Sequence, residues 1–554
     1  MKNPLHVGIA GACGRGAGFK AACDAHGGVR IHAVCDTNAA DLPAAAERLG
    51  AAEQYTDYEQ MIAASDLDAV IIATPMPLHV PQAVAALKED LHVLSEVPAG
   101  VSVAECQQLV LACRASKGIY MMAENYTYMR PNVLVRALVE RGLFGTTYYA
   151  EGEYIHELKG LNEITKWRRK WQTGTNGVTY GTHSLGPILQ WMPRDRVAAV
   201  ACAGSGHHYL DPRGDIYENE DSDVMLCRMQ SGGLVKIRVD MLSDRPHAMT
   251  NYQLQGTDGC YESARARGDR NRIWLRARSK DANEWTALED LEAEFMPESW
   301  REASETARKA GHGGGDYFEV MDFVEAALGR RPSAIDIDVA MDMTMPGLAS
   351  QQSIAEGGRW VNVPDSRAWI DASSLPRPQL NMIWPESLLA HPPTPHVPAG
   401  YRLRSWRPSD AAEYFALMEK AGFPGWDAAR MAGMLKRVLP EGLFVVEHTA
   451  TGMLAATAMA VHSPSDLHPF GGELGWVAGD PAHKGKGLGL AVCAAVTALL
   501  VSRGYRRIYL LTDDWRLPAI QTYLKLGYEP LRFVDGMSER WQAVREKLAR
   551  GPRA

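Results

Sequence analysis

The sequence predicts an α/β fold in which a doubly wound parallel sheet is followed by two further α/β domains. Three observations support this prediction. Strand-like and helix-like segments alternate over residues 1–125, polar and apolar residues alternate along much of 126–374, and mixed signals return after residue 400. A chain of 554 residues is also too long for one hydrophobic core. We therefore expect domains at 1–125, 126–374 and 401–554, with a linker at 375–400.

The first domain is predicted from four short apolar segments, at residues 7–10, 31–35, 69–73 and 92–95. Residues 69–73 are apolar throughout, as expected for a strand that is buried on both faces of a parallel sheet. A helix is expected at 15–25. Strands that alternate with helices in this way predict a doubly wound sheet.

The central domain and the linker have different signals. Residues 147–154 and 233–239 alternate between polar and apolar side chains, which predicts antiparallel strands with one solvent-facing side. The central sheet should therefore be open and mostly antiparallel. Beyond it, residues 376–398 hold seven prolines. Because proline lacks a backbone donor and favours extended backbone, this density predicts an interdomain linker.

Composition excludes several classes of function. A net charge of −8 speaks against general nucleic-acid binding, which usually needs a basic surface. The nine cysteines are scattered and form no CxxC pair, which predicts reduced thiols and no metal site. No stretch approaches the roughly 18 apolar residues of a membrane span, and glycines interrupt the first apolar run too early for a signal peptide. We expect a cytoplasmic protein that contacts neither nucleic acid nor membrane.

A glycine-rich turn follows the first predicted strand and opens a helix, with the sequence Gly11-Ala12-Cys13-Gly14-Arg15-Gly16. Such a turn brings backbone N–H groups and a helix N-terminus to a pyrophosphate. Cys13 stands at the second glycine of GxGxxG, so a tight structural turn is the alternative. Asp36 ends the second strand, 25 residues after Gly11. A carboxylate there binds a ribose 2′-hydroxyl and repels a 2′-phosphate, which favours NAD over NADP; a plain turn residue is the alternative.

Two strand-end motifs resemble the cofactor motifs of the Gfo/Idh/MocA oxidoreductases, namely Ala73-Thr74-Pro75-Met76-Pro77-Leu78-His79 and Glu96-Val97-Pro98. The resemblance covers roughly residues 5–370. It implies an N-terminal Rossmann domain, bound NAD, and a central sheet that forms homo-oligomers. The family usually has Glu-Lys-Pro, whose Lys handles the proton of the oxidised hydroxyl; Val97 cannot transfer a proton. The residues expected to contact NAD are Gly11, Cys13, Gly14, Arg15, Gly16, Asp36, Thr74, Pro75, His79, Glu96, Val97 and Asn125.

Further motifs resemble a narrower branch, the NAD-dependent glycosidases related to α-N-acetylgalactosaminidases (glycoside hydrolase family 109). Ordinary Gfo/Idh/MocA oxidoreductases have the motif Asp-x-Gly-x-His-x-x-Asp, whereas this chain keeps His183 and has Thr179 and Gly186 in place of the two acids. The other matching motifs are Glu96-Val97-Pro98-Ala99, Ala123-Glu124-Asn125-Tyr126, Glu153-Tyr154-Ile155-His156, Trp167-Arg168 and Gly311-His312-Gly313-Gly314-Gly315-Asp316. The resemblance implies that NAD transiently oxidises carbon 3 of a sugar, a base removes the carbon 2 proton with loss of the anomeric substituent, water adds, and the hydride returns.

Chemistry assigns roles within these motifs. His183 is the expected general base for the carbon 3 hydroxyl. Tyr180 would share a helical face with His183 if the segment is helical, and could relay the proton or polarise the ketone. Tyr154 is a candidate for carbon 2 deprotonation or water activation, with ordinary packing as the alternative. Substrate contacts are expected from Glu124, His156, Arg168, His312 and Asp316. A structural hydrogen bond is the alternative for His156 and Arg168, and a helix cap is the alternative for Asp316.

A second glycine turn precedes an apolar helix in the third domain, with the sequence His483-Lys484-Gly485-Lys486-Gly487-Leu488-Gly489. It resembles the pyrophosphate motif Arg/Gln-x-x-Gly-x-Gly/Ala of GNAT acetyltransferases, with Lys484 at the first position. Residues 519–528 match the closing motif of that family, in which Tyr523 would protonate the CoA thiolate. Glu473 is a plausible general base for an amine. Expected acetyl-CoA contacts are Val477, Lys484, Gly485, Gly487 and Gly489.

Three functions remain open at this point. The first is a bifunctional enzyme that cleaves glycosides by transient oxidation and transfers an acetyl group to an amine. The second is a net sugar dehydrogenase that releases NADH, with a GNAT domain attached. The third is a non-catalytic sensor of NAD or acetyl-CoA. The replacement of Lys by Val97 favours the first over the second, and His183 with the two GNAT motifs speaks against the third. The expected partners are a sugar or glycoside and an amine acceptor.

Overall fold

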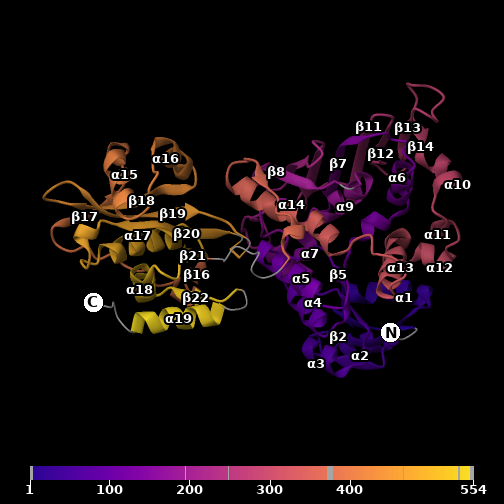
Figure 1. Ribbon diagram of the computed structural model, residues 1–554, viewed down its shortest axis with the longest axis horizontal. Coiled ribbons are helices and arrows are strands. Elements are labelled where there is room, and N and C mark those ends of the chain that lie inside the picture. The colour runs from indigo at the N-terminus through magenta and orange to yellow at the C-terminus, as the bar shows by residue number, and fades with distance from the viewer. Residues whose placement is uncertain are drawn as a thin grey trace. The chain divides into compact units, whose positions relative to one another are not determined.

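A computed structural model describes residues 4–193, 195–246, 249–370, 379–465, 467–468, 470–533 and 537–549. The chain divides into two compact units, Met1–Leu375 and Pro376–Ala554. Figure 1 shows that each unit is built from a sheet-containing α/β arrangement. Within the ranges given above, no helix combines the length and apolarity needed to cross a bilayer.

The first sheet is the predicted doubly wound sheet. Its six strands follow the order β3-β2-β1-β4-β5-β6 and all pair in parallel. Their bounds are β1 Leu5–Ala10, β2 Val29–Cys35, β3 Glu53–Tyr55, β4 Ala69–Ile72, β5 His92–Glu96 and β6 Tyr120–Ala123. The strand order reverses between β1 and β4, and ligands of such sheets bind in the crevice at that reversal. The expected helix at 15–25 is a short 3-10 helix, η1 (Arg15–Phe19), followed by α1 (Lys20–His26).

The central sheet has nine strands in the order β14-β13-β12-β11-β7-β10-β9-β8-β15. The two segments with alternating polarity form β7 (Thr147–Ile155) and β10 (Leu234–Asp240). These two strands pair in parallel, which corrects the antiparallel expectation for them, whereas the pairs β10–β9 and β11–β7 are antiparallel. Alternating polarity indicates that one face of a strand is exposed to solvent, but it does not indicate the direction of the strand. The direction is determined by how the chain between the two strands connects them. The remaining strands of the sheet are β8 Val197–Gly204, β9 Asp223–Met229, β11 Met249–Gly256, β12 Gly259–Glu262, β13 Arg272–Leu275, β14 Thr286–Ala287 and β15 Val361–Asn362.

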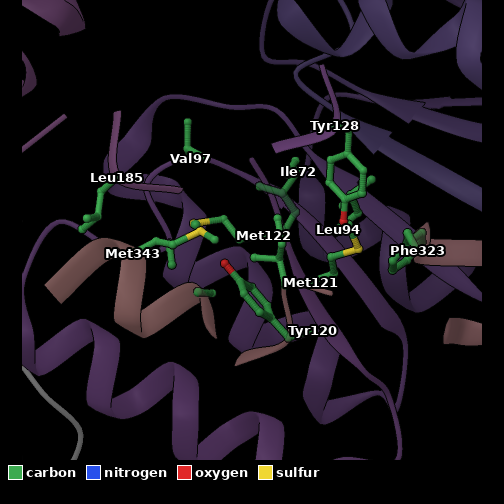
Figure 2. Packing of buried hydrophobic residues seen from close by; sticks show 14 of the residues in the cluster. Ile72, Leu94, Val97, Tyr120, Met121, Met122, Tyr128, Leu185, Phe323 and Met343 are labelled. Atoms are coloured by element: carbon green, nitrogen blue, oxygen red, sulfur yellow. The ribbon is translucent and has the colours of Figure 1, made fainter. Parts of the chain in front are cut away.

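The first two expected domains share one core. The late helix α14 (Ile337–Ala355) packs against both sheets, and the Thr344 hydroxyl lies 3.7 Å from the sulfur of Met122 in β6. Figure 2 shows Met122, Met343 of α14 and Leu185 of α9 (Thr182–Trp191) gathered in this core. Because buried apolar area stabilises roughly in proportion to its extent, a shared core fixes the first sheet against the central one.

The second unit contains a seven-stranded sheet in the order β17-β18-β19-β20-β21-β16-β22. Strand β16 (Leu380–Ile383) comes from the expected linker and pairs with β21 and β22, which corrects the linker prediction. Residues 379–384 contain no proline, so the segment can pair although prolines flank it. Leu380 and Met382 are fully buried. The other strands are β17 Tyr401–Ser405, β18 Val438–His448, β19 Leu454–His462, β20 Gly471–Gly479, β21 Arg507–Thr512 and β22 Glu529–Leu531.

Helices cover both faces of this sheet. One face packs against α17 (Leu488–Ser502) and α18 (Leu517–Leu526) in a cluster that includes Val492 and Ile520. The opposite face packs against α15 (Ala411–Lys420) and α16 (Ala428–Leu435). The unit is therefore a three-layer α/β structure, as predicted for the third domain.

Candidate functional site

A cavity of about 340 Å³ opens in the first unit where the doubly wound sheet meets the central part of the chain. Its walls are the glycine turn, the loops after β4 and β5, and residues of the central region. The predicted site residues that line it are Gly11, Gly14, Arg15, Asp36, Thr74, Pro75, His79, Glu96, Val97, Asn125, Tyr154, His156, Arg168, Tyr180, His183 and His312. Segments as far apart in sequence as residues 11 and 312 thus converge on one cavity.

The glycine turn fits a dinucleotide. A Cβ on Gly11 would lie 2.4 Å from the Ala73 carbonyl oxygen, and one on Gly16 would lie 2.7 Å from the Gly11 carbonyl oxygen, so the fold itself requires both glycines. Gly14 differs, because its nearest neighbour to an added Cβ would be 3.8 Å away and its φ is negative. Packing therefore does not require glycine at that position. The space in front of Gly14 suits a ligand that approaches the backbone closely.

Asp36 lies at the carboxyl end of β2 as expected. Its carboxylate accepts hydrogen bonds from the N–H groups of Cys13 (2.8 Å) and Asn38 (2.9 Å). Cys13 faces this carboxylate and does not line the cavity, and burial together with the Asp36 charge raises the pKa of the Cys13 thiol to about 11. Cys13 therefore orients Asp36 through its backbone, while its thiol stays neutral near pH 7.

Arg15 connects the glycine turn to Asp316, a residue near the end of the sequence of the first unit. Its Nε donates to Glu96 Oε1 at 2.6 Å, and its Nη1 donates to Asp316 Oδ2 at 3.1 Å. Asp316 is fully buried and does not line the cavity, which corrects the expectation of a substrate contact. Burial alone raises a carboxyl pKa, but the hydrogen bond from His312 and the charge of Arg15 hold the pKa of Asp316 well below its usual range. Asp316 therefore anchors Arg15 and His312 as a permanent anion.

Glu124 is also placed differently from the expectation. It is fully buried, does not line the cavity, and its Oε1 lies 2.8 Å from Nδ1 of His183. A carboxylate can only accept a hydrogen bond, so Nδ1 of His183 holds the proton and Nε2 is left as the acceptor. His183 lines the cavity near the start of α9. Glu124 thus orients the His183 ring and does not itself line the cavity.

Tyrosine rings surround His183. The centroids of the Tyr126, Tyr154 and Tyr180 rings lie 4.3, 5.4 and 5.4 Å from the His183 centroid. Tyr180 precedes α9 and is not helical, so the conditional argument from a shared helical face does not apply, although the two rings do meet. The Tyr154 hydroxyl lies 2.9 Å from Nδ1 of His156. Four of the predicted side chains therefore lie within one aromatic cluster.

Arg168 supplies positive charge beside this cluster. It lies in α8 (Trp167–Trp171), where Nε donates to the Thr165 hydroxyl and Nη1 donates to Gln172 at 2.8 Å. Burial raises the pKa of Tyr180 to about 12, and the Arg168 charge partly opposes that rise. Among the residues the structure describes, no carboxylate forms an ion pair with Arg168. Its charge is therefore available to a ligand.

His79 and Val97, two residues of the NAD motifs, contribute to the cavity in different ways. Nδ1 of His79 lies 3.0 Å from the Pro98 carbonyl and Nε2 lies 2.9 Å from the Thr74 carbonyl. Burial lowers the pKa of His79, and a neutral imidazole has a single N–H, so one of the two carbonyls accepts a hydrogen bond from it and the other is in contact only. His79 therefore connects the loops after β4 and β5, so that its effect on a cofactor is exerted through Thr74 and Pro98. Val97 is buried, and it places an apolar side chain at the cavity wall.

The second candidate site lies in the second unit, where strands β20 and β21 separate. Their parallel pairing covers only Gly471 to Glu473, and both strands then continue without pairing each other. On its other edge β20 has a bulge, in which Trp476 adopts φ +49°. A split of this kind exposes backbone donors and acceptors of the two strands to a ligand.

The glycine turn of the second unit lies directly after β20. Gly485 (φ +82°) and Gly487 (φ +77°) need left-handed backbone, which favours glycine. Gly489 is helical, and a Cβ there would meet nothing within 4 Å. The first N–H groups of α17 lack intrahelical partners, and the exposed Lys484 lies in the turn before them, a combination that suits an anion. Of the three glycines in this turn, Gly489 is the one that neither a positive φ nor packing requires.

The two predicted catalytic groups of this unit lie on opposite faces of its sheet. Glu473 pairs across from Val461, whose side chain packs against α15 and α16. Tyr523 packs in the cluster beneath α17 on the other face. Burial raises the pKa of the Glu473 carboxyl, and burial also raises the pKa of Tyr523 well above its usual value. A half-buried base and a protonated phenol therefore flank the split from its two sides.

Comparison with known proteins assigns both units. Residues 5–124 match the oxidoreductase family with an NAD-binding Rossmann fold, and residues 128–370 match the glycosyl hydrolase 109 C-terminal domain. A glycosyl hydrolase family 109 protein from Saccharopolyspora erythraea is 30% identical over 390 residues, which cover 65% of this chain and 83% of that protein. The chain belongs to glycosyl hydrolase family 109. In addition, residues 404–528 of this family 109 protein match the acetyltransferase (GNAT) family.

Other relatives agree with this assignment. An alpha-N-acetylgalactosaminidase from Shewanella oneidensis is 29% identical over 385 residues, covering 63% of this chain and 82% of that protein. Levoglucosan dehydrogenase in complex with NADH and L-sorbose matches with a TM-score of 0.56 and 21% identity, over 66% of this chain and 100% of that one. At that identity the likeness shows the fold alone. The resemblance to Gfo/Idh/MocA oxidoreductases, the narrower branch and the GNAT domain are all confirmed, and the chain is an NAD-binding oxidoreductase of that type.

Several residues of the family 109 cavity were not singled out from the sequence. Tyr126 and Trp167 line it, and both stand in motifs that match the family, so their signal was present. Met249 also lines the cavity, in left-handed backbone with φ +51°. No local pattern marks Met249, because it reaches the cavity only through the pairing of β11 with β7.

Proposed function

We propose that the first unit cleaves a glycoside through transient oxidation at carbon 3. The observation that supports this best is the Glu124–His183 pair, which faces a tyrosine cluster at a cavity where Val97 replaces the usual lysine. The residues present supply a base for a hydroxyl proton but no lysine beside the cofactor. Paired carboxylates facing the substrate, which ordinary glycosidases use, are not needed for such chemistry.

Different residues of the cavity would carry out the separate steps of the reaction. Bound NAD would supply the hydride acceptor and donor in the space before Gly14. Nε2 of His183 takes the proton of the carbon 3 hydroxyl, and the Glu124 carboxylate stabilises the imidazolium. The Tyr180 hydroxyl, held neutral by its raised pKa, donates a hydrogen bond to the carbonyl oxygen at carbon 3.

A second proton has to leave carbon 2. The Tyr154 hydroxyl can take it only if Tyr154 passes its own proton on, because burial holds the Tyr154 pKa well above its usual value. Nδ1 of His156, 2.9 Å away, is the group placed to receive that proton. Arg168, at the cavity wall with no ion-pair partner among the described residues, would bind a hydroxyl, amide or carboxylate of the sugar.

Isotope exchange tests this proposal. An aryl α-N-acetylgalactosaminide turned over by the full chain in deuterium oxide should give a sugar with deuterium at carbon 2 and no accumulated NADH. His183→Ala should lose most of this activity and still bind NAD. Stoichiometric NADH without deuterium incorporation would support the net dehydrogenase instead.

We further propose that the second unit transfers an acetyl group from acetyl-CoA to an amine. Gly489 supports this most directly, because neither packing nor φ requires glycine there. A ligand bound at the helix N-terminus would require it, since a side chain at this position would block the ligand's approach. Backbone groups of β20 near Val477, where pairing with β21 has ended, would hold the pantetheine arm. Glu473 would accept the amine proton, and Tyr523 would protonate the departing thiolate.

Calorimetry on the full chain tests the acetyl-CoA site. Wild type should release heat with acetyl-CoA, and Gly489→Glu should abolish it by placing bulk and negative charge at the pyrophosphate. Gly433→Glu is the matched control, since Gly433 is also a helical glycine with open space around its Cβ. If the wild-type protein releases no heat with acetyl-CoA, the GNAT domain does not bind this cofactor and has a structural role only.

A further inference from the structure

An aromatic and arginine cluster lies on one face of the GNAT sheet. The Arg430 guanidinium lies 4.8 Å from the Trp426 ring centroid and 5.1 Å from that of Trp476. The two indoles meet edge to face at 5.0 Å, and the Phe423 ring lies 5.7 Å from Trp476. Arg516 covers Phe423 at 4.5 Å. The α15–α16 loop, helix α16, the β20 bulge and the loop before α18 therefore meet at one place.

This cluster shares a sheet face with Glu473. Glu473 and Gly475 pair with Val461 and Met459, and both of those side chains belong to the core beneath α15 and α16. Trp426 and Trp476 pack on that same core, whereas Leu474 faces the core beneath α17. An acceptor amine that approaches Glu473 therefore comes from the side of the sheet that holds the aromatic and arginine cluster.

The backbone at Trp476 is held in a strained conformation. A non-glycine residue at φ +49° lies in the left-handed region, which is less favourable for it than ordinary strand geometry. The bulge places two residues, Trp476 and Val477, opposite Ala458 alone. The strained turn therefore directs the Trp476 indole to Arg430 on this face. Such strain tends to persist where a site needs it.

Arg430 is the cation of the cluster that remains open to a ligand. Arg516 donates to Asp513 at 3.0 Å, so its charge is already paired. In the described part of the chain no carboxylate pairs with Arg430, and its Nη1 makes only two 3.3 Å contacts, to the carbonyls of Pro424 and Gly425. Cation–π contact with the two indoles keeps the Arg430 guanidinium at this place, and its N–H groups that point away from the rings suit a planar carboxylate.

We propose that this cluster binds a carboxylate on the acyl acceptor, so that the acceptor is an amine that also bears a carboxyl group. The inference rests on the proposed acyltransferase function of the second unit. One unpaired arginine balances a single negative charge, which favours a carboxylate over a phosphate dianion. The aromatic rings would cover the apolar part of the acceptor between its carboxylate and its amine. Arg430 is then the residue that determines acceptor specificity.

Matched acceptor pairs test this inference. The full chain, saturated with acetyl-CoA, is given amino acids beside their amides, and 2-amino-2-deoxyglucuronic acid beside glucosamine, with CoA release as the readout. The carboxylate member of a pair should react with a kcat/KM at least about tenfold higher. Arg430→Ala should remove that preference through KM, and Arg430→Lys should restore only part of it. Arg503→Ala, which alters an exposed arginine directly after α17, is the control that should leave the preference intact.

The outcomes separate the two levels of the proposal. Failure of acetyl-CoA to bind by calorimetry would remove the acyltransferase function and this inference with it. If acetyl-CoA binds, any one of three results would overturn the carboxylate site alone. These are a preference for the neutral member of a pair, no reaction of any carboxylate member, and an unchanged preference in Arg430→Ala.

Discussion

Glu124, which does not reach the cavity, contacts Nδ1 of His183, which does. The carboxylate therefore lies behind the base, on the far side of the imidazole from any substrate. When His183 takes a proton inside a buried site, the positive charge that forms is poorly solvated, and an adjacent carboxylate offsets that cost. This arrangement gives His183 a fixed orientation and a counter-charge without a lysine at position 97.

Replacement of Glu124 by glutamine should weaken the base without disturbing cofactor binding. The amide keeps a similar shape but loses the negative charge, and a charge-assisted hydrogen bond is worth roughly 1.5–3 kcal/mol. Turnover of the aryl glycoside should therefore fall by about 10–100-fold, while NAD binds with unchanged affinity by calorimetry. The control is Glu140→Gln, an exposed acid on α6 (Arg130–Glu140). Full activity in Glu124→Gln would show that His183 needs no counter-charge.

Asp36 should make the chain select NAD over NADP. Its carboxylate is held by the N–H groups of Cys13 and Asn38 at the cavity, where it would repel a 2′-phosphate. Titration of wild type should show much weaker binding of NADP, and Asp36→Ala should lower NAD affinity while narrowing the difference between the two cofactors. Equal affinity of wild type for both cofactors would contradict the assignment.

The stability of the first unit should fall as pH rises through neutrality because of Asp223. Burial, with a smaller contribution from the Glu220 charge, raises the pKa of Asp223 to about 8 from an ordinary value of 3.8. The folded state then holds an extra proton between those values, so the contribution of Asp223 to stability is greatest below about pH 4 and is lost, by up to about 1.4 kcal/mol per pH unit, as pH approaches 8. The Asp223 carboxylate accepts from Gly177 N–H and Asn219, next to the segment that leads to His183.

Thermal melts at several pH values check this expectation. Asp223→Asn should match wild type below about pH 4 and should be the more stable protein at pH 8, because it has no charge to bury. Asp215→Asn, which alters an exposed acid, should melt like wild type at both. A loss of stability in Asp223→Asn that is equal at the two pH values would mean that Asp223 acts through its hydrogen bonds alone.

The boundary of the GNAT domain should depend on β16. A fragment that begins at residue 376 keeps Leu380–Ile383 between β21 and β22, whereas one that begins at residue 400 loses this buried strand. The longer fragment should unfold cooperatively and bind acetyl-CoA. The shorter one should be insoluble or lack a cooperative transition, because Leu380 and Met382 leave a gap in the core. Equal stability of the two fragments by denaturant titration would contradict this role for β16.

Local signals in the sequence were enough for the two glycine turns and the strands beside them. The turn at Gly11, the strand-end Asp36 and the turn at Gly487 all follow from residue types at short spacings, because backbone conformation and helix starts are set within a few residues. His183 was likewise found from its surrounding motif, and the structure places it at the cavity.

Tertiary structure alone decided which segments meet. Strand β16 was hidden because its proline-free segment lies within a proline-rich stretch, and only its pairing with β21 reveals it. Glu124 and Asp316 looked like substrate contacts, yet they are buried behind His183 and Arg15. Arg430 carried no recognisable motif, since its stacking on Trp476 depends on a bulge in a distant strand. Periodicity and turn residues determine local structure, whereas burial and long-range pairing depend on the whole packed chain.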